Sequence, residues 1–499
     1  MHPAAALLPL LLAGAIARLP AQSFVVVGAP ELLDAADALC AHRGKQGLSV
    51  ERLPYGEGTA CTDPEALRRA LHERIRAEDQ PGYLLLLGDP LGELPLPPLE
   101  RPGLRTFGIP HGKERVVSDL GYVDVDDDGR PEWACGRLPC RTPQEVRAAA
   151  RKILAYERTP PDDDGWQRDV ALIANSGDFG AVIDALLENA IQELLRDNLA
   201  PGDRVCGVVG LKDNPLYAPP EDFLPRVLAA LDAGPFAAVY AGHGSTTRFA
   251  PVAGHPVLRS ADAAKLRSAE RTALFAFACH IGAFHRECLG EALLRAEHGP
   301  CAVVAASEVS FPYGDVLFAR EMLRVLSVAD GPLRIGDLVA RGKAALLADE
   351  PDPYRARAER LARTLGYDAE QCAHLRRYTA DLYHLLGDPA MPLRLPRPLE
   401  VAAEQAEAGG PLRVRIVCPG DARPRALRVE LCVDRGARRD DGAATDVLAT
   451  ATARPSKDGA EVEFAFAALP ARGRYVWVRV YGRDGEDCWT GGARIAVRR

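Results

Sequence analysis

The sequence lacks several features that mark whole classes of protein. After the N-terminus, no apolar run is long enough for a transmembrane helix, so we expect no membrane span in the mature chain. The net charge is −8, and without an excess of positive charge nucleic acid is not an expected partner. The 12 cysteines are irregularly spaced and indicate no small disulfide-stapled scaffold. With 47% hydrophobic and 26% charged residues, the composition is that of an ordinary globular protein.

The strongly apolar segment at the N-terminus, residues 1–16, is too short to span a bilayer and is followed by small residues. This pattern predicts a signal peptide within residues 1–22, and therefore export to the periplasm, the cell surface or the medium. No Lys or Arg precedes the apolar stretch, so a frayed apolar extension is the alternative.

From residue 23 the pattern alternates between short apolar strands and amphipathic helices. Strands are expected at 24–28 and 83–87, and helices at 30–43 and from Asp63 to about 77. A Pro- and Asp-rich segment at 159–165 predicts a boundary, after which the same alternation resumes, with a helix over 182–194. We therefore expect an N-terminal α/β subdomain at 23–160 and a second at 161–395, both built on a doubly wound sheet.

The pattern of apolar and polar residues changes after residue 395. Short segments alternate with period two at 412–417, 427–433, 460–466 and 475–481, and turn sequences separate them. Alternation of this kind over about a hundred residues predicts a β-sandwich at 396–499.

Two of the apolar strands end in reactive side chains. One runs from Phe236 to Tyr240 and leads to His243, and the other covers 272–277 and leads to Cys279. In open α/β sheets the chemistry lies just beyond the carboxyl ends of the strands, so we expect His243 and Cys279 on one edge. A Cys whose proton a nearby His can take is the nucleophile and base pair of a cysteine hydrolase.

The stretches around these strands resemble the gingipain family of cysteine peptidases, which belongs with the caspases and legumains. The matching segments are Tyr240-Ala-Gly-His-Gly-Ser245, Phe277-Ala-Cys279, Glu287-Cys-Leu-Gly-Glu-Ala-Leu293, Gly136-Arg-Leu-Pro-Cys-Arg-Thr142 and Gly387-Asp-Pro-Ala-Met391. The resemblance covers about 24–395 and implies a caspase-like α/β catalytic region, followed by an immunoglobulin-like sandwich.

The resemblance also implies roles for individual residues of an endopeptidase. Cys279 would form a thioester acyl-enzyme, His243 would be the base, and the N–H groups of Gly244 and Cys279 would form the oxyanion hole. The orienting acid would be Glu132. No organic cofactor is required, and the expected partners are protein or peptide substrates.

For the S1 pocket, the aromatic wall of the family falls on Tyr313. The nearby carboxylates Glu308 and Asp315 predict a preference for a basic residue at P1.

Two metal hypotheses also arise. Asp124, Asp126 and Asp128 stand at alternate positions before Gly129, like the first half of a calcium loop, although the position of the usual glutamate is Cys135. A structural Ca²⁺ is one interpretation and a solvated acidic turn the other. A zinc site is the second metal hypothesis, with four candidate ligands: Cys279, His280, His285 and Cys288. It is disfavoured because the spacing of these residues matches no zinc motif.

Two other functions stay open at this point. One is a non-catalytic extracellular binding or secretion-assembly protein with the same fold, and the other is a transpeptidase in which an amine replaces water as the acyl acceptor. The presence of both His243 and Cys279 favours the peptidase over the inert scaffold.

Overall fold

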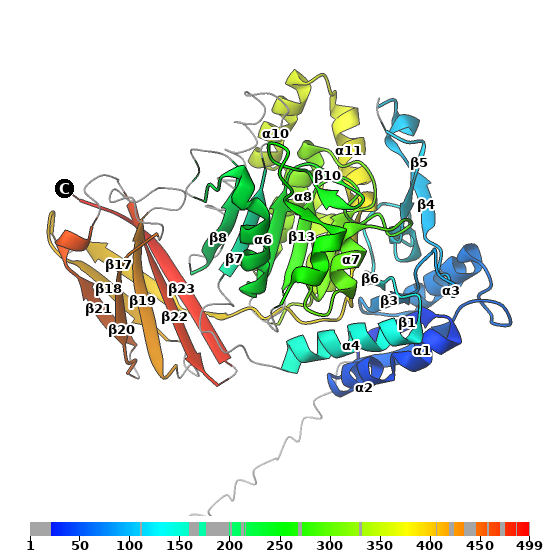
Figure 1. The fold of residues 1–499 in the computed structure, drawn as a ribbon, viewed down its shortest axis with the longest axis horizontal. Coiled ribbons are helices and arrows are strands. Elements are labelled where there is room, and N and C mark those ends of the chain that lie inside the picture. Colours follow the sequence, from blue (N-terminus) through cyan, green and yellow to red (C-terminus); the bar gives the residue numbers. More distant parts are fainter. Residues whose placement is uncertain are drawn as a thin grey trace, which may run out of the picture.

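The computed structural model (Figure 1) describes most of the chain. The described residues are 21–109, 112–158, 169–175, 199, 202–210, 214, 216–267, 272–328, 332–405, 407–418, 424–433, 446–456, 459–469, 475–485 and 487–498. The predicted helix at 182–194 and nearly all of the predicted signal peptide at 1–22 lie outside them.

A ten-stranded sheet forms the centre of the α/β region, in the order β2-β1-β3-β6-β15-β14-β13-β9-β7-β8. In that order the strands are Ser49–Pro54, Ser23–Gly28, Tyr83–Leu87, Ala134–Leu138, Tyr383–Leu386, Ala302–Ala306, Ala273–Phe277, Ala237–Ala241, Asp169–Ala174 and Arg204–Val209. The interior strands are continuous apolar runs because both faces of the sheet are covered, as in other buried parallel sheets. The expected α/β fold class is confirmed.

The sheet consists of two parallel halves that meet at one antiparallel seam. β15 runs parallel to β6 but antiparallel to β14, with Ala306 opposite Tyr383. The sequence pattern in this region predicts helical structure up to about 384, and it therefore does not reveal this strand. β15 comes from the second predicted subdomain yet pairs with β6 of the first, so one sheet runs through both; the division at 160 stays a prediction.

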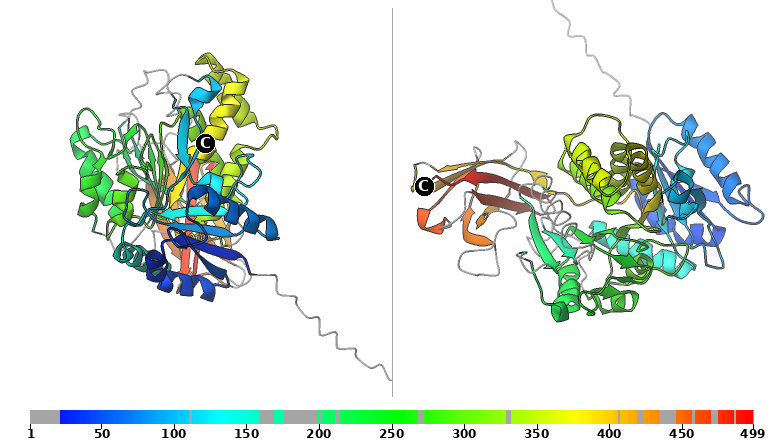
Figure 2. Two further views of the ribbon diagram at one scale, coloured as in Figure 1. Left: turned by 90° about the vertical axis from the view of Figure 1, so that its right-hand side faces the viewer. Right: turned by 90° about the horizontal axis from the view of Figure 1, so that it is seen from above.

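Helices cover both faces of the sheet, as Figures 1 and 2 show. Alternate side chains of β1 divide between two cores, with Phe24 and Val26 on the side of α1 and α4 and Val25 and Val27 on the side of α3. The expected helix at 30–43 is two helices that meet at Ala36. Among the described residues, the α-helices are α1 Pro30–Ala35, α2 Asp37–Lys45, α3 Pro64–Ala77, α4 Pro143–Arg158, α6 Phe223–Asp232, α7 Leu289–Arg295, α8 Pro312–Ser327, α9 Ile335–Leu346, α10 Pro353–Thr364 and α11 Ala369–Leu382.

Small antiparallel elements extend from the main sheet. They are the hairpin of β4 (Leu99–Pro102) and β5 (Arg115–Ser118), and the three-stranded ribbon β10 (Gly244–Ser245), β11 (Arg248–Phe249) and β12 (Leu258–Arg259). The ribbon starts at the third residue after β9 and therefore belongs to the edge where His243 was expected.

The C-terminal region is a β-sandwich with its own apolar core, as an immunoglobulin-like domain would have. Figure 1 shows it beside the β8 end of the large sheet, where Gly202 contacts Thr490. One sheet contains β16 Arg397–Pro398, β23 Asp487–Ala496, β22 Tyr475–Asp484, β19 Ala426–Val433 and β20 Val447–Ala453, and the other β17 Glu400–Gln405, β18 Leu412–Val417 and β21 Ala460–Phe464.

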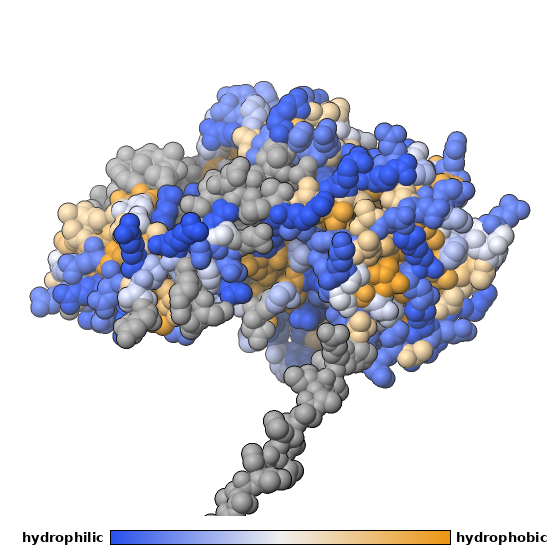
Figure 3. All heavy atoms as spheres, turned by 90° about the horizontal axis from the view of Figure 1, so that it is seen from below, coloured by the Kyte–Doolittle hydropathy of each residue, from blue (hydrophilic) through white to orange (hydrophobic). Residues whose placement is uncertain are grey.

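Seen from below, the surface is mainly hydrophilic, with apolar areas interspersed (Figure 3). Within the described residues, no helix combines the length and the apolar character needed to cross a bilayer.

Candidate active site

The two strands that carry the predicted base and nucleophile are neighbours. β9 pairs in parallel with β13, and Ala241 stands opposite Phe277. The N–H of Gly242 donates to the Phe277 carbonyl across 3.3 Å, which continues the pairing beyond the last strand residue. His243 and Cys279 each follow two residues after this matched pair, so the sheet brings both to the same edge, as the sequence predicted.

Two hydrogen bonds hold the backbone carbonyl of His243. Its carbonyl oxygen accepts hydrogen bonds from the Tyr240 hydroxyl at 2.6 Å and from the Ala250 N–H at 2.9 Å. The Tyr240 ring stacks on Phe249 of β11 at a centroid distance of 3.5 Å, and its hydroxyl also accepts from the Asn175 amide. Strands β9 and β11 thus fix the loop from which the imidazole projects.

The loop of His243 touches the loop of Cys279 directly. A methyl group built on Gly244 would lie 2.6 Å from the Cys279 carbonyl oxygen and 3.0 Å from the Ala278 side chain. Both distances are shorter than van der Waals contact, so only glycine allows the two backbones to approach this closely. The preceding glycine, Gly242, has φ of +153°. The glycines that flank His243 are therefore required by the geometry of the turn.

Cys279 is partly exposed, and a tight turn follows it. His280 has φ of +62°, an uncommon conformation for a residue with a side chain, and its N–H donates to the Glu308 carbonyl at 3.0 Å. Burial raises the pKa of the Cys279 thiol, and a hydrogen bond from Ser310 opposes the shift. A thiol with a raised pKa needs a base to become a nucleophile.

Ser310 contacts the nucleophile through its backbone and lies close to it through its side chain. Its N–H donates to Cys279 Sγ at 3.3 Å, its carbonyl accepts from the thiol at 3.7 Å, and its Oγ lies 4.0 Å from Sγ. The sequence analysis missed this residue, which carries no motif. The position of Ser310 four residues beyond β14, the neighbour of β13, was the available signal.

Asp315 is buried near the nucleophile, with Oδ2 accepting from the Ser310 hydroxyl at 2.8 Å and Oδ1 from the Tyr383 hydroxyl at 2.7 Å. Burial raises the pKa of its carboxyl to about 7. Asp315 therefore supports Ser310, the residue that contacts the nucleophile, and its role in recognising a P1 side chain stays a prediction.

Glu308 lies near the nucleophile, but cations surround it. Lys113 and Arg286 both bind Oε1, the latter at 2.6 Å, and His280 and His285 lie within 3.6 Å of the carboxylate. These partners lower the pKa of Glu308 to about 2, against the opposing effect of burial. A carboxylate that already neutralises two cations is poorly suited to bind a basic P1 side chain, so this part of the S1 prediction does not fit the contacts.

Tyr313 stands in the first turn of α8. Its hydroxyl accepts from Arg376 of α11 at 3.0 Å, and burial raises its pKa to about 12. This contact fixes the ring against α11, and its role as the wall of the S1 pocket stays a prediction.

Glu132 lies just before β6, which is four strands from β9 in the sheet. Adjacent strands are separated by about 4.8 Å, so the axes of β6 and β9 are roughly 19 Å apart. The Glu132 carboxylate accepts from the Val125 N–H at 2.7 Å and thereby closes the acidic turn. This contact gives Glu132 a structural role, and its role in orienting the imidazole stays a prediction.

The acidic turn gathers its three aspartates as the calcium hypothesis requires. One oxygen from each of Asp124, Asp126 and Asp128 lies within 4.8 Å of the others, and Asp124 Oδ1 is buried without a hydrogen-bond partner among the described residues. Arg101 already binds Asp124 Oδ2 at 2.7 Å. The oxygen donors suit a hard cation such as Ca²⁺, and its binding stays a prediction. Within the described part of the chain, this is the one cluster close enough for a metal, and the disfavoured zinc set forms none.

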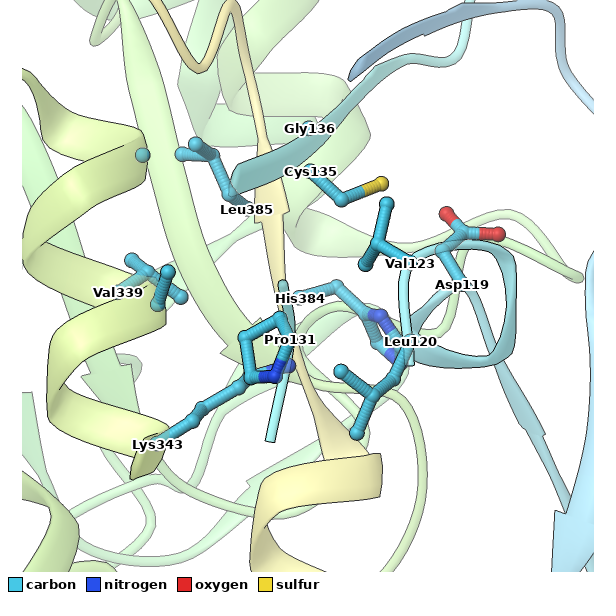
Figure 4. A pocket seen from close by; sticks show the side chains of 12 residues that line it. Asp119, Leu120, Val123, Pro131, Cys135, Gly136, Val339, Lys343, His384 and Leu385 are labelled. Atoms are coloured by element: carbon cyan, nitrogen blue, oxygen red, sulfur yellow. The ribbon is translucent and has the colours of Figure 1, made fainter. Parts of the chain in front are cut away.

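A small polar cavity lies between β6, β15 and α9 (Figure 4). Lys343 and His384 point toward it, and burial lowers the pKa of Lys343 to about 8. Its volume is about 20 Å³, enough for a single water molecule. The cavity is too small for a peptide side chain and does not serve as the substrate site.

Comparison of the whole chain with known proteins finds similarity to gingipains. Lys-gingipain of Porphyromonas gingivalis is 23% identical over 396 residues, and Lys-gingipain W83 of the same species is 24% identical over 397 residues. Both alignments cover 76% of this chain, which spans only about a fifth (21%) of the length of either relative.

The solved structures support the fold. The crystal structure of the Arg-specific cysteine proteinase gingipain R matches with a TM-score of 0.57 at 19% identity, covering 96% of this chain and 98% of that one. A complex of the pro- and mature domains of a Porphyromonas gingivalis gingipain matches with a TM-score of 0.54 at 17% identity, covering 95% and 100%.

The family model described as peptidase family C25 matches residues 18–394, which include both strands, the ribbon and the seam of the sheet. The chain belongs to peptidase family C25.

Proposed function

We propose that this protein is a cysteine endopeptidase that hydrolyses peptide bonds through Cys279 and His243. One observation carries the proposal: Gly244 approaches the Cys279 carbonyl so closely that a methyl group would overlap it. A base and a nucleophile on touching loops, at the carboxyl ends of adjacent parallel strands, form the arrangement that nucleophilic acyl transfer needs.

The mechanism follows from the chemistry of these groups. His243 takes the proton of the Cys279 thiol, and the thiolate attacks the scissile carbonyl carbon to form a tetrahedral intermediate. The N–H groups of Gly244 and Cys279 are the proposed donors to its oxyanion. His243 then protonates the departing amine, which leaves a thioester, and water activated by the same His hydrolyses the thioester to an acid and the free thiol.

The proposed dyad does not include Glu132. The test is the pH profile of kcat/KM for Glu132→Gln, which removes the charge and keeps the shape of the side chain. We expect a profile within about threefold of the wild type, since removal of a residue that orients the base costs far more in a triad. A loss of a hundredfold or more would instead support the predicted role of Glu132 in orienting the imidazole.

A preference for a basic P1 residue is proposed only from the names of the relatives, Lys-gingipain and the Arg-specific gingipain R. Glu308 is not the proposed recognition residue. Export is likewise proposed from the sequence of residues 1–22 alone.

The decisive experiment is cleavage of a positional-scanning fluorogenic peptide library by the wild type, Cys279→Ala and His243→Ala. Cys288→Ala serves as the matched control, because Cys288 is also a cysteine of this region but is buried at the start of α7. We expect cleavage by the wild type and the control, and none by the other two variants. Cleavage that persists in folded Cys279→Ala would refute the proposal.

A further inference from the structure

The nucleophile is connected by hydroxyl groups to a buried carboxyl group. Cys279 Sγ lies 4.0 Å from Ser310 Oγ, which donates to Asp315 Oδ2, and the other carboxyl oxygen accepts from Tyr383. Three separate parts of the fold supply the chain, since Ser310 follows β14, Asp315 lies on α8 and Tyr383 begins β15. The carboxyl group is therefore linked to the nucleophile through a single hydroxyl group.

The surroundings of Asp315 supply hydroxyl and thiol groups but no cation among the described neighbours. The titratable groups facing it are Tyr383 of β15, Tyr378 of α11 and Cys279 after β13. Glu308, by contrast, binds two cations. Burial without a counter-ion favours the neutral form of Asp315, although the two hydroxyl groups oppose this, and its pKa is raised to about 7.

The protonation state of Asp315 decides which way the Ser310 hydroxyl points. An ionised carboxylate only accepts hydrogen bonds, so the Ser310 O–H must donate to it, and an oxygen lone pair then faces Sγ. A protonated carboxyl group can instead donate to Ser310 Oγ, which frees the Ser310 O–H to donate to Sγ. A donor facing Sγ stabilises the thiolate, whereas a lone pair and a nearby negative charge destabilise it.

We propose that Asp315 is a positioning residue that controls the reactivity of Cys279 through Ser310: the protonated carboxyl group orients the hydroxyl toward the thiolate, and the ionised form turns it away. The inference rests on the proposed role of Cys279 as nucleophile. It adds to that role a proton switch on Asp315, a residue outside the Cys279–His243 pair.

The size of the effect follows from the distances. Asp315 Oδ2 lies no more than 6.8 Å from Sγ, because Ser310 Oγ is 4.0 Å from Sγ and 2.8 Å from Oδ2. One unit charge at this distance, at an effective dielectric constant of about 20, changes the pKa of the thiol by about 1–2 units.

The test is the rate of alkylation of Cys279 by iodoacetamide as a function of pH, followed by mass spectrometry of the Cys279 peptide. Asp315→Asn keeps the carboxyl shape, is neutral at every pH and can donate to Ser310 Oγ. We expect it to lower the apparent pKa of Cys279 by about 1–2 units, whereas Ser310→Ala, which removes the connecting hydroxyl group, produces no such decrease. A merely structural role for Asp315 would change the alkylation rate without moving its pH midpoint.

Tyr383→Phe is a second variant that tests the proposal if Asp315→Asn does not fold. It removes one donor to the carboxylate, so Asp315 stays protonated to higher pH and the midpoint for Cys279 moves in the same direction by a smaller amount. Tyr122→Phe is the matched control, because it deletes a buried hydroxyl that donates to Pro97 far from this chain of contacts. A midpoint unchanged within about 0.3 units in folded Asp315→Asn or Tyr383→Phe would overturn the proposal. Alkylation needs no peptidase activity, so its outcome is independent of whether the proposed function holds.

Discussion

The contact between the loops of His243 and Cys279 yields a sharp prediction for Gly244→Ala. The added methyl group would lie 2.6 Å from the Cys279 carbonyl oxygen, 2.9 Å from Ile281 Cδ1 and 3.0 Å from Ala278 Cβ. Carbon and oxygen atoms in contact lie about 3.4 Å or more apart, so the loops must separate by roughly 1 Å. A misplacement of about 1 Å between reacting groups costs on the order of 100-fold in rate, or about 2.7 kcal/mol.

The assay is kcat/KM on the best peptide from the positional library, measured beside the urea midpoint of the same preparation. Gly44→Ala is the control, because a methyl group at that position in α2 meets only one atom, at 4.0 Å. We expect Gly244→Ala to lose about 100-fold in kcat/KM. Its free energy of unfolding should fall by no more than about 1–3 kcal/mol, the usual range for overpacking. If folded Gly244→Ala hydrolyses the peptide at the wild-type rate, the loops do not need this close approach, and the reasoning fails.

Three further predictions concern stability. Asp388→Asn removes one partner of the buried Arg43, which Asp388 binds at 2.7 Å, and should lower the free energy of unfolding by about 3 kcal/mol in urea denaturation; an unchanged midpoint would contradict this. Glu308 has a pKa of about 2 in the folded protein against an ordinary 4.5, so the stability that its ionised form contributes is complete above pH 4.5 and is lost as the pH falls toward 2. Glu308→Gln should therefore be less stable than the wild type by about 2–3 kcal/mol at pH 6, and this difference in the free energy of unfolding should shrink below pH 4.5. A difference that does not depend on pH would count against the ion pairs. Calcium at about 100 times its dissociation constant should add about 2.7 kcal/mol to the wild type and nothing to Asp126→Asn, as read from thermal unfolding midpoints; equal responses would argue for a solvated turn.

The sequence was sufficient to predict the α/β body, the sandwich and the edge that carries the site. Buried parallel strands are continuous apolar runs, and those at 236–240 and 272–277 were identified with bounds close to β9 and β13. The strand β15 was missed because its residues, Tyr383–Leu386, continue the apolar pattern of α11 without a turn. A short apolar run next to a helix cannot be assigned by periodicity, and the pairing with β14 and β6 decides its conformation.

The parts of the site that depend on backbone conformation could be predicted from the sequence, whereas contacts made only by side chains could not. Glycines flank His243 in the sequence, which allows a sharp turn of the backbone, and the structure places Gly244 against Cys279. Asp315, by contrast, stands in an ordinary amphipathic helix, and a carboxylate three residues into α8 has the same sequence signature whether it faces substrate or core. Its burial depends on β15 packing behind it, which periodicity along the chain does not encode.

The missed strand helps to determine where two carboxyl groups lie. β15 lies between β14 and β6 and supplies Tyr383, whose hydroxyl binds Asp315 and directs that carboxylate into the core. The same strand adds one full spacing between β6 and the strands of the nucleophile and base, so the strand that Glu132 precedes is four spacings from β9. A strand at the centre of the sheet therefore separates one acidic segment from the base, and it holds another carboxyl group against Ser310, the residue that contacts the nucleophile.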